Sequence, residues 1–288
     1  MYDGQVRVTA IDATETVREA QRRQGTLSAA SAGLGRMLVG TLLLASDIKD
    51  EATVTVQMAG NGPAGKVVAN ANGKLQGRGY VDRPEIGLPL NDQGKLDVRG
   101  ALGSEGTFTV IKDLGLKEPF SGQVPIVSGE VAEDFTYYLA VSEQIPSAVG
   151  LGVLVAPDEH ILQAGGWLLQ ALPGASEECL DELERAVAET PHITKLLAAG
   201  ERPVDIIHRL AGDAGEPKIL AERPVSFHCP CSKERFKRGL IALGPEELTT
   251  LIEEDGEAEA VCHFCNEKYH FDQGELVALR QEALQKED

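Results

Sequence analysis

The sequence predicts an α+β protein with an N-terminal mixed α/β-sheet domain, a helical linker and a small C-terminal zinc-binding domain. In the first part of the chain, short β-rich runs alternate with Gly- and Asn-rich turns. Short helical patterns separated by Gly and Pro follow, and two close cysteine pairs lie near the end. We therefore place the core domain at residues 1–175, the linker at residues 176–224 and the zinc-binding domain at residues 225–288.

The composition is that of a soluble protein without a nucleic-acid or membrane partner. Lys and Arg number 27 against 45 Asp and Glu, so the net charge of −18 repels phosphate backbones. The first residues lack a basic segment followed by an apolar run, so we expect no secretory signal and a cytoplasmic location. The most apolar stretch, residues 28–46, is divided by Arg36. Its uninterrupted part, residues 37–45, is far shorter than the roughly 20 residues that a bilayer span needs.

The core domain is expected to begin with a strand, a helix and a buried apolar helix. Residues 6–11 form the strand, and Asp12 caps a helix that runs to about Arg23 and is stopped by Gly25. Residues 28–46 form the apolar helix, in which small residues permit close packing: Ala29, Ala32, Gly33 and Gly40. The next strands are expected to form an antiparallel meander over residues 53–58, 66–70, 75–81 and 107–111.

The rest of the core domain is expected to contain one helix and two strands. Ser128 opens the helix, which ends before Pro146. Its apolar face consists of Val131, Phe135, Tyr138 and Leu139. Residues 150–155 and 161–169 are expected to complete the sheet, and Pro173-Gly174 marks the domain boundary.

Three short helices are predicted in the linker. Residues 177–189 form an amphipathic helix, Thr190-Pro191 starts a second helix that Gly200 ends, and Pro203 starts a third. Isolated helices shorter than about 12–15 residues are marginal in water, so these helices must pack on other parts of the chain. The linker is therefore a conditional structure, and it lies directly before the cysteines.

Four of the five cysteines have the spacing of a metal site. Cys229-Pro230-Cys231 is followed by Cys262-His263-Phe264-Cys265. Two close thiol pairs on two turns are what a tetrahedral four-thiolate Zn²⁺ site requires, with one ion per chain. The surrounding elements are expected to be strands and helices at residues 225–228, 232–243, 245–254, 258–261 and 268–271, and Asp272 caps a final helix with Glu275 at the capping-box position.

Other interpretations of these cysteines remain open. They can be buried thiols without a metal, or they can form a purely structural zinc site. Because zinc-bound sulfur is thiolate, the species that oxidants attack, either pair can instead close on itself as a disulfide and expel the metal. Such local disulfides constrain little chain, so the domain would loosen. Three histidines could each replace a thiolate, but four cysteines already complete the shell: His228, His263 and His270.

A second alternative is a nucleic-acid-binding zinc ribbon. The helix after Cys231 carries a basic face made of Lys233, Arg235, Lys237 and Arg238. We favour the interpretation that this face compensates the formal −2 charge of a four-thiolate zinc centre and the acidic run at residues 253–257.

An enzyme is the third alternative, and the sequence gives little support for it. Gly60-x-Gly62-x-x-Gly65 matches a dinucleotide-binding pattern, but a strand rather than a helix is expected to follow, so we interpret it as a turn. No nucleophile or carboxylate lies at a recognisable spacing from His160, His192 or His208. Cys179 is expected on the apolar side of its helix, in a packing role.

The sequence resembles the redox-regulated 33-kilodalton heat-shock chaperone family of bacterial holdases over essentially its whole length. The most specific features are Cys229-x-Cys231 and Cys262-x-x-Cys265. Supporting segments are Tyr137-Tyr138-Leu139-Ala140-Val141-Ser142-Glu143-Gln144-Ile145-Pro146-Ser147, and Gln163-Ala164-Gly165-Gly166 leading to Gln170-Ala171-Leu172-Pro173-Gly174-Ala175.

This resemblance implies an ATP-independent holdase rather than an enzyme. It implies zinc ligation by Cys229, Cys231, Cys262 and Cys265 in a reduced, inactive form. Oxidation is then expected to form the Cys229–Cys231 and Cys262–Cys265 disulfides, release zinc and unfold the switch domain and linker. The active form is expected to dimerise and to bind unfolding client proteins. We hypothesise that the linker docks on the core in the reduced state through Leu180, Leu183, Val187, Leu196, Leu197, Ile206 and Ile207.

Overall fold

The protein is described by a computed structural model that covers residues 4–212 and 216–287. The chain divides into an N-terminal unit, Met1–His228, and a C-terminal unit, Cys229–Asp288. The strands of the N-terminal unit are β1 (Val6–Asp12), β2 (Thr53–Gly60), β3 (Lys66–Asn72), β4 (Gln76–Val81), β5 (Gly106–Asp113), β6 (Phe120–Pro125), β7 (Ser147–Val155), β8 (Ile161–Ala171) and β9 (Ser226–Phe227). Its helices are α1 (Thr14–Gln24), α2 (Ser28–Ala45), α3 (Val98–Leu102), α4 (Ala132–Val141), α5 (Glu177–Glu189), α6 (Ile193–Ala198) and α7 (Pro203–Ala211).

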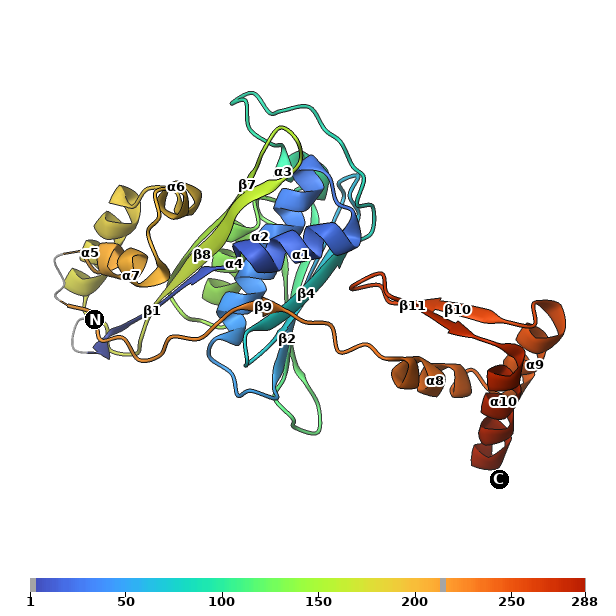
Figure 1. Ribbon diagram of the computed structural model, residues 1–288. Coiled ribbons are helices and arrows are strands. Elements are labelled where there is room, and N and C mark those ends of the chain that lie inside the picture. Colours follow the sequence, from blue (N-terminus) through green and yellow to red (C-terminus); the bar gives the residue numbers. More distant parts are fainter. Residues whose placement is uncertain (1–3, 213–215, 288) are drawn as a thin grey trace. The chain divides into compact units, whose positions relative to one another are not determined.

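The N-terminal unit contains two sheets (Figure 1). The larger has the strand order β6-β5-β2-β3-β4-β9 and is antiparallel except for the parallel pair β4–β9. The predicted meander is confirmed for β2, β3 and β4, but its fourth strand, β5, pairs with β2 instead of following β4. The prediction that β7 and β8 complete the same sheet is wrong. They pair with β1 in a separate antiparallel sheet of order β1-β8-β7, in which Val6 lies opposite Ala171.

The apolar helix α2 is the centre of the core. It contacts strands of both sheets, and its small residues allow the close packing that the sequence predicts. A Cβ atom added to Gly40 would lie 2.4 Å from the ring of Phe135 on α4. Among the described residues, α2 is the one helix that is both long enough and apolar enough to cross a membrane. However, 89% of its 18 residues are buried inside the protein. A core helix of a soluble protein has this pattern.

Two helices begin later than predicted, because side chains organise the preceding loops. Helix α1 starts at Thr14, whose backbone N–H and Oγ1 donate to Asp12 Oδ1 at 3.0 and 2.6 Å. Helix α4 starts at Ala132 rather than at Ser128. The buried carboxylate of Asp134 accepts backbone N–H groups from the loop before α4, and so holds that loop outside the helix. These donors are Val127, Ser128, Gly129 and Val131.

The helices α6 and α7 pack on the smaller sheet, and α5 packs against α7. Two sheet glycines leave room for α6, since a Cβ atom on Gly165 would lie 2.7 Å from Leu197 Cδ1 and one on Gly152 would lie 2.6 Å from Ile193 Cγ2. The buried residues of this interface, which we call the linker cluster, are Val6, Trp167, Leu169, Cys179, Leu183, Ile193, Leu196, Leu197, Ile206 and Leu210.

The linker cluster contains most of the residues hypothesised to dock the linker. Leu183, Leu196, Leu197 and Ile206 are buried in it, and Val187 packs against it while partly exposed. Leu180 and Ile207 are half-buried. Cys179 also lies in the cluster, on the apolar side of α5 as expected.

The C-terminal unit contains α8 (Lys233–Ile241), α9 (Pro245–Glu254), β10 (Ala258–Val261), β11 (Lys268–Phe271) and α10 (Gln273–Glu287). The predicted capping box is present, because the N–H of Glu275 donates to Asp272 Oδ1 at 2.9 Å and the N–H of Asp272 donates to Glu275 Oε2 at 3.3 Å. Its own apolar core is small and consists of Ile241, Leu248, Phe271, Leu276, Leu279 and Ala283. A core of this size supplies little folding free energy, so a bound metal would contribute substantially to the stability of the unit.

Candidate metal centre

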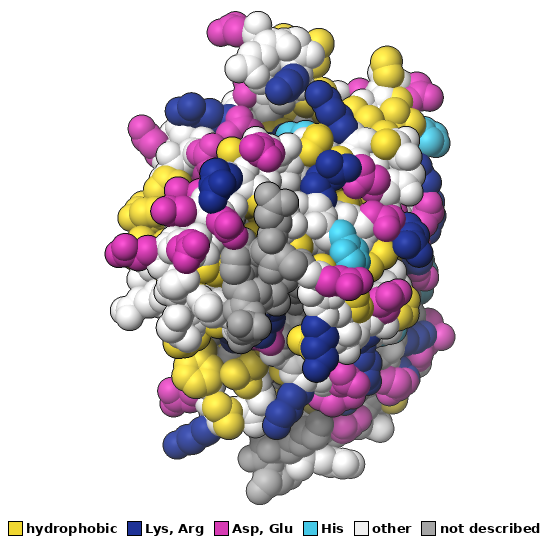
Figure 2. Space-filling view, turned by 90° about the vertical axis from the view of Figure 1, so that its left-hand side faces the viewer, with side chains coloured by type: hydrophobic (Ala, Val, Ile, Leu, Met, Phe, Trp, Pro, Cys, Tyr) yellow, Lys and Arg dark blue, Asp and Glu magenta, His cyan; other side chains and the backbone are white. Residues whose placement is uncertain are grey.

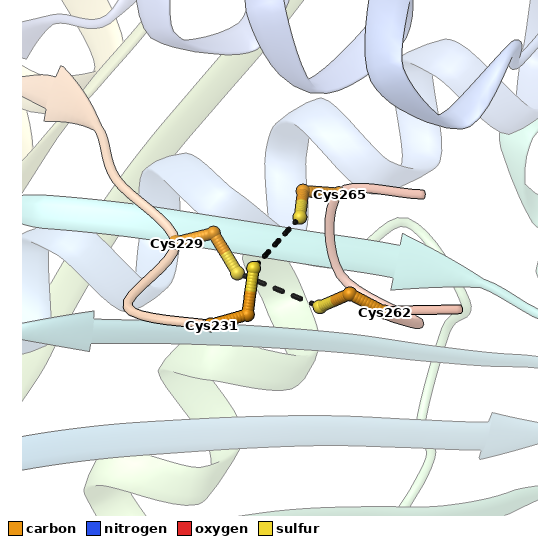
Figure 3. Close-up of side chains that lie close together, drawn as sticks. All are labelled: Cys229, Cys231, Cys262 and Cys265. Atoms are coloured by element: carbon orange, nitrogen blue, oxygen red, sulfur yellow. Dashed lines mark hydrogen bonds between the residues drawn. The ribbon is translucent and has the colours of Figure 1, made fainter. Parts of the chain in front are cut away.

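The four cysteines predicted as ligands converge from two loops of the C-terminal unit (Figure 3). Cys229 and Cys231 lie in the segment between β9 and α8, and Cys262 and Cys265 lie in the turn between β10 and β11. Their Sγ atoms all lie within 4.8 Å of one another. Among residues 4–212 and 216–287, this is the one group of three or more potential ligands that the structure brings together.

The sulfur positions fit a four-thiolate metal ion. Two sulfur pairs join opposite loops, with 3.6 Å between Cys229 Sγ and Cys262 Sγ and 3.3 Å between Cys231 Sγ and Cys265 Sγ. A tetrahedral ion with metal–sulfur bonds of about 2.3 Å places its sulfur ligands about 3.8 Å apart. The two separations are slightly shorter than this value, and no pair of the four sulfurs is more than 4.8 Å apart. An ion at the centre would therefore link the two loops with little movement of either.

The backbone around the second pair forms a tight turn. The N–H groups of Cys265 and Asn266 donate to the carbonyl oxygen of Cys262 at 3.3 and 2.8 Å, and the N–H of Cys262 donates to the carbonyl oxygen of Glu267 at 2.9 Å. Asn266 has a φ of 55°, in the left-handed region that asparagine tolerates better than most residues. The turn thus orients both sulfurs to the same side.

Burial acts against free thiolates at this centre. It raises the pKa of Cys262 and of Cys265, although backbone N–H groups of Phe264 and Glu267 act in the opposite direction by hydrogen bonding to these sulfurs. A buried group loses its charge unless an opposite charge lies beside it. A bound divalent cation supplies that charge and keeps coordinating thiols deprotonated. The donor set is thus suited to a thiophilic metal ion.

A hydroxyl group from outside the cysteine pattern supports the centre. Tyr269, on β11, donates its phenolic hydrogen to Cys231 Sγ at 3.2 Å, and this bond raises the pKa of Tyr269. Its ring lies 5.0 Å from the ring of Phe236 on α8, measured between centroids. No sequence pattern identifies Tyr269, because it lies 38 residues from Cys231 in the chain.

The remaining candidates lie elsewhere or take other roles. His270 Nε2 lies 3.1 Å from a carboxylate oxygen of Glu259. The Gly60–Gly65 segment connects β2 to β3, so the interpretation of that motif as a turn is confirmed. Cys179 is buried in the linker cluster of the N-terminal unit.

The basic face of α8 is partly neutralised inside the C-terminal unit. Lys233 Nζ lies 2.7 Å from a carboxylate oxygen of Glu275 and 5.1 Å from the ring centroid of Phe271. Lys237 Nζ lies 2.9 Å from Glu234. The sequence interpretation assigned the acidic run at residues 253–257 as a partner of this basic face. Lys233 and Lys237 instead pair with Glu275 and Glu234.

The chain matches known proteins over nearly its whole length. The model of the family described as "Hsp33 protein" matches residues 1–272. The 33 kDa chaperonin of Enterococcus faecalis is 55% identical over 283 residues, which cover 98% of this chain and 95% of that protein. The 33 kDa chaperonin of Bacillus subtilis is 51% identical over 279 residues, which cover 97% and 95%.

A solved structure shares the fold. The crystal structure of the 33 kDa chaperonin of Thermotoga maritima, a heat shock protein 33 homologue, matches with a TM-score of 0.90 and 39% identity over 99% of this chain and 97% of that one. These matches span both units and include the segment that carries the four cysteines. The chain therefore belongs to the Hsp33 family, a family of non-enzymatic chaperones.

Proposed function

We propose that this protein is a redox-regulated, ATP-independent holdase of the bacterial cytoplasm. In the reduced form, Cys229, Cys231, Cys262 and Cys265 hold one Zn²⁺ and the protein is inactive. In the oxidised form it binds unfolding client proteins and keeps them from aggregating. The observation that carries the proposal is the convergence of four Sγ atoms within 4.8 Å, in a unit whose apolar core is small.

The metal acts as a crosslink in the reduced state. Four thiolates are the donor set that suits Zn²⁺. Because each loop supplies two of the four sulfurs, a bound ion would tie the segment after β9 to the turn between β10 and β11. The crosslink therefore stabilises the whole C-terminal unit rather than either loop alone.

A peroxide removes this crosslink by converting ligands to disulfides. The thiolate of Cys229 attacks one peroxide oxygen and becomes a sulfenic acid, and the other oxygen leaves as water after taking up a proton. The thiolate of Cys231 then attacks that sulfur and displaces hydroxide, which takes up a proton to become water, so one peroxide is reduced for each disulfide formed. Cys262 and Cys265 react in the same way with a second peroxide.

The two disulfides do not replace the lost crosslink. Each closes only a few residues within one loop, so it restricts the unfolded chain very little. The ties between the two loops are lost with the four thiolates, and the C-terminal unit loosens. The linker helices α5, α6 and α7 then leave the smaller sheet. Their departure exposes the linker cluster on both the helices and the sheet.

The exposed apolar surface accounts for client binding and for dimerisation of the oxidised form. The net charge of −18 keeps such a form in solution. The charge also acts against nucleic-acid binding. On the face of the molecule drawn in Figure 2, acidic and basic side chains are interspersed with small apolar areas rather than gathered into a basic surface.

Disulfide mapping together with an aggregation assay tests this proposal. The reduced, zinc-loaded protein is treated with peroxide, disulfides are mapped by mass spectrometry, and light scattering of a heat-unfolding client is followed. We expect Cys229–Cys231 and Cys262–Cys265 bonds, and suppression of scattering by the treated protein alone. The Cys179→Ala variant, which removes a thiol without adding a polar group to the linker cluster, serves as the matched control and is expected to behave like the wild type. Equal suppression before and after treatment would instead indicate a purely structural zinc site.

A further inference from the structure

The segment just before the first cysteine pair is attached to the core sheet. Residues 223–228, here called the strap, include β9 and belong to the N-terminal unit. In Figure 1 the orange chain that carries β9 runs beside β4 and α1. The strand predicted at residues 225–228 forms over Ser226–Phe227, where it extends the large sheet.

Backbone and arginine hydrogen bonds fix the strap. β9 lies parallel to β4, with Ser226 opposite Gln76 and Phe227 opposite Gly77. The N–H of Ser226 donates to the carbonyl oxygen of Leu75 at 3.1 Å, and the N–H of His228 donates to that of Gly77 at 3.1 Å. Upstream, the guanidinium of Arg223 donates to two carbonyl oxygens, those of Gly73 at 2.8 Å and Ser46 at 2.6 Å.

A receptor for one aromatic side chain lies beside this strand pair. Phe227 is half-buried and packs against the main core. The guanidinium carbon of Arg23 lies 5.7 Å from the centroid of its ring, within the range of a cation–π contact. Arg23 is itself held by Glu19 at 2.7 Å. In-register neighbours of a parallel pair point to the same face, so the ring lies on the face of β4 that α2 covers, where a Cβ atom on Gly77 would lie 2.8 Å from Leu38 Cδ1.

The strap is also easy to remove. β9 pairs with two of the six residues of β4, and Ser226 is exposed. Phe227 lies only two residues before Cys229, a residue of the candidate metal centre. The position of the strap therefore depends on whether that centre is ordered. Loss of order at Cys229 frees one end of a two-residue strand, and so short a pairing has little stability of its own.

We propose that the strap occupies the docking site for an extended client segment, which adds to β4 in place of β9 and puts an aromatic side chain where Phe227 now lies. This inference rests on the proposed holdase function and identifies one surface for it, separate from the linker cluster. Backbone hydrogen bonds to β4 do not depend on the sequence of the added strand, which suits clients of many sequences. The aromatic receptor beside Arg23 adds a preference for extended segments that carry Phe, Tyr or Trp, as the strap carries Phe227.

A labelled peptide provides the test. A fluorescent peptide with the sequence of residues 220–228 is titrated into the full-length protein, and its anisotropy is measured with the reduced zinc-loaded form and with the oxidised form. We expect binding to the oxidised form, competition with a client for that form, and binding to the reduced form that is weaker by about tenfold or more. The peptide with Phe227→Ser is expected to lose about tenfold in affinity for the oxidised form, and the peptide with Leu220→Ser is expected to bind like the original.

Two full-length variants separate this inference from the proposed function. Phe227→Ser is expected to free the site, so that the reduced form of this variant binds the peptide without oxidant. Leu220→Ser is the matched control, because Leu220 lies in the same segment but is 79% exposed. Failure of the oxidised wild type to protect any client would contradict the holdase function, and peptide binding to reduced Phe227→Ser would still test the docking site.

Three results would overturn the inference. One is equal affinity of the peptide for the reduced and oxidised wild type, and another is equal affinity of the original and Phe227→Ser peptides. The third is dissociation of oxidised dimers by the peptide without displacement of client, which would assign the edge of β4 to a second copy of the chain.

Discussion

The phenolic hydroxyl of Tyr269 donates a hydrogen bond to Cys231 Sγ at 3.2 Å. It joins the strand β11 to the segment that follows β9, and it stabilises negative charge on the sulfur. Groups of this kind around a metal site commonly change metal affinity by about 10–100-fold when they are removed. Tyr269 therefore belongs to the candidate metal centre although it is not a ligand.

Removal of this hydroxyl is expected to weaken the metal site without unfolding the unit. Tyr269→Phe keeps the ring that packs against Phe236 and loses only the hydrogen bond. We expect zinc affinity to fall by about tenfold in competition with a chelator, and zinc release under peroxide to become faster. The Tyr137→Phe variant, altered in the N-terminal unit, is the control. Equal affinities for Tyr269→Phe and the wild type would show that the hydrogen bond does not support the metal.

Substitution of single cysteines is expected to divide the five into two classes. Cys262→Ser removes one sulfur of the cluster. Bound zinc should therefore fall well below the value of about one ion per chain that is expected for the wild type. Because metal binding and folding are coupled in small metal-stabilised units, near-UV circular dichroism from the C-terminal unit should also decrease. Cys179→Ser lies in the linker cluster and should keep its zinc. Full zinc occupancy in Cys262→Ser would exclude that sulfur as a ligand.

A charge placed in the linker cluster is expected to release the linker without oxidant. Leu197 is 6% exposed and contacts the sheet at Gly165. Truncation of a buried leucine costs about 2–5 kcal/mol, and a buried unpaired carboxylate adds to that cost. Reduced Leu197→Glu should show greater dye binding and faster proteolysis within α5, α6 and α7. The exposed Leu154→Glu serves as the control, and unchanged protection in Leu197→Glu would contradict the docking hypothesis.

Mild acid is expected to weaken the docking of α6. His192 is exposed, yet partial desolvation of its ring, together with the nearby charges of Arg36, Lys95 and Lys195, lowers its pKa below the ordinary value of 6.5. The undocked histidine thus takes up a proton more readily than the docked one. The docked state therefore has its full stability above about pH 6.5 and loses stability as the pH falls below that value.

The single tryptophan reports this change. Trp167 lies in the linker cluster and is 6% exposed, so its emission should shift to the red when the linker leaves. In the reduced protein, the denaturant midpoint of that shift should be lower at about pH 5.5 than at about pH 7.5. His192→Asn should reduce the difference, and an unchanged difference in that variant would assign the pH dependence to other groups.

The sequence allowed accurate prediction where local patterns determine the structure. Three features were recognised because the residues that form them are close in the sequence. They are the apolar run of α2, the capping box of Asp272 and Glu275, and the two cysteine pairs. The helix α5 was predicted at residues 177–189, the same bounds that the structure gives. Its amphipathic pattern also identified Leu183 as a docking residue.

Prediction failed where the partner is distant in the sequence. Nothing near Val6 indicates that it pairs with Ala171, so the two sheets were merged into one. Nothing near Phe227 indicates that a two-residue strand joins β4. The edge strand β6 (Phe120–Pro125) was missed because Gly and Pro interrupt its weak alternation. Asp134 accepts hydrogen bonds from the backbone N–H groups of several preceding residues. No simple sequence spacing predicts such an arrangement, so the later start of α4 was missed.

The most direct test of the account is a single time course of oxidation. Zinc release measured with a colorimetric chelator, Trp167 emission and light scattering of a heat-unfolding client are followed together after peroxide is added. The account predicts that about one zinc per chain leaves, that the emission shifts to the red, and that client protection rises only as both changes proceed. Release of zinc with no change in emission and no gain in protection would contradict it.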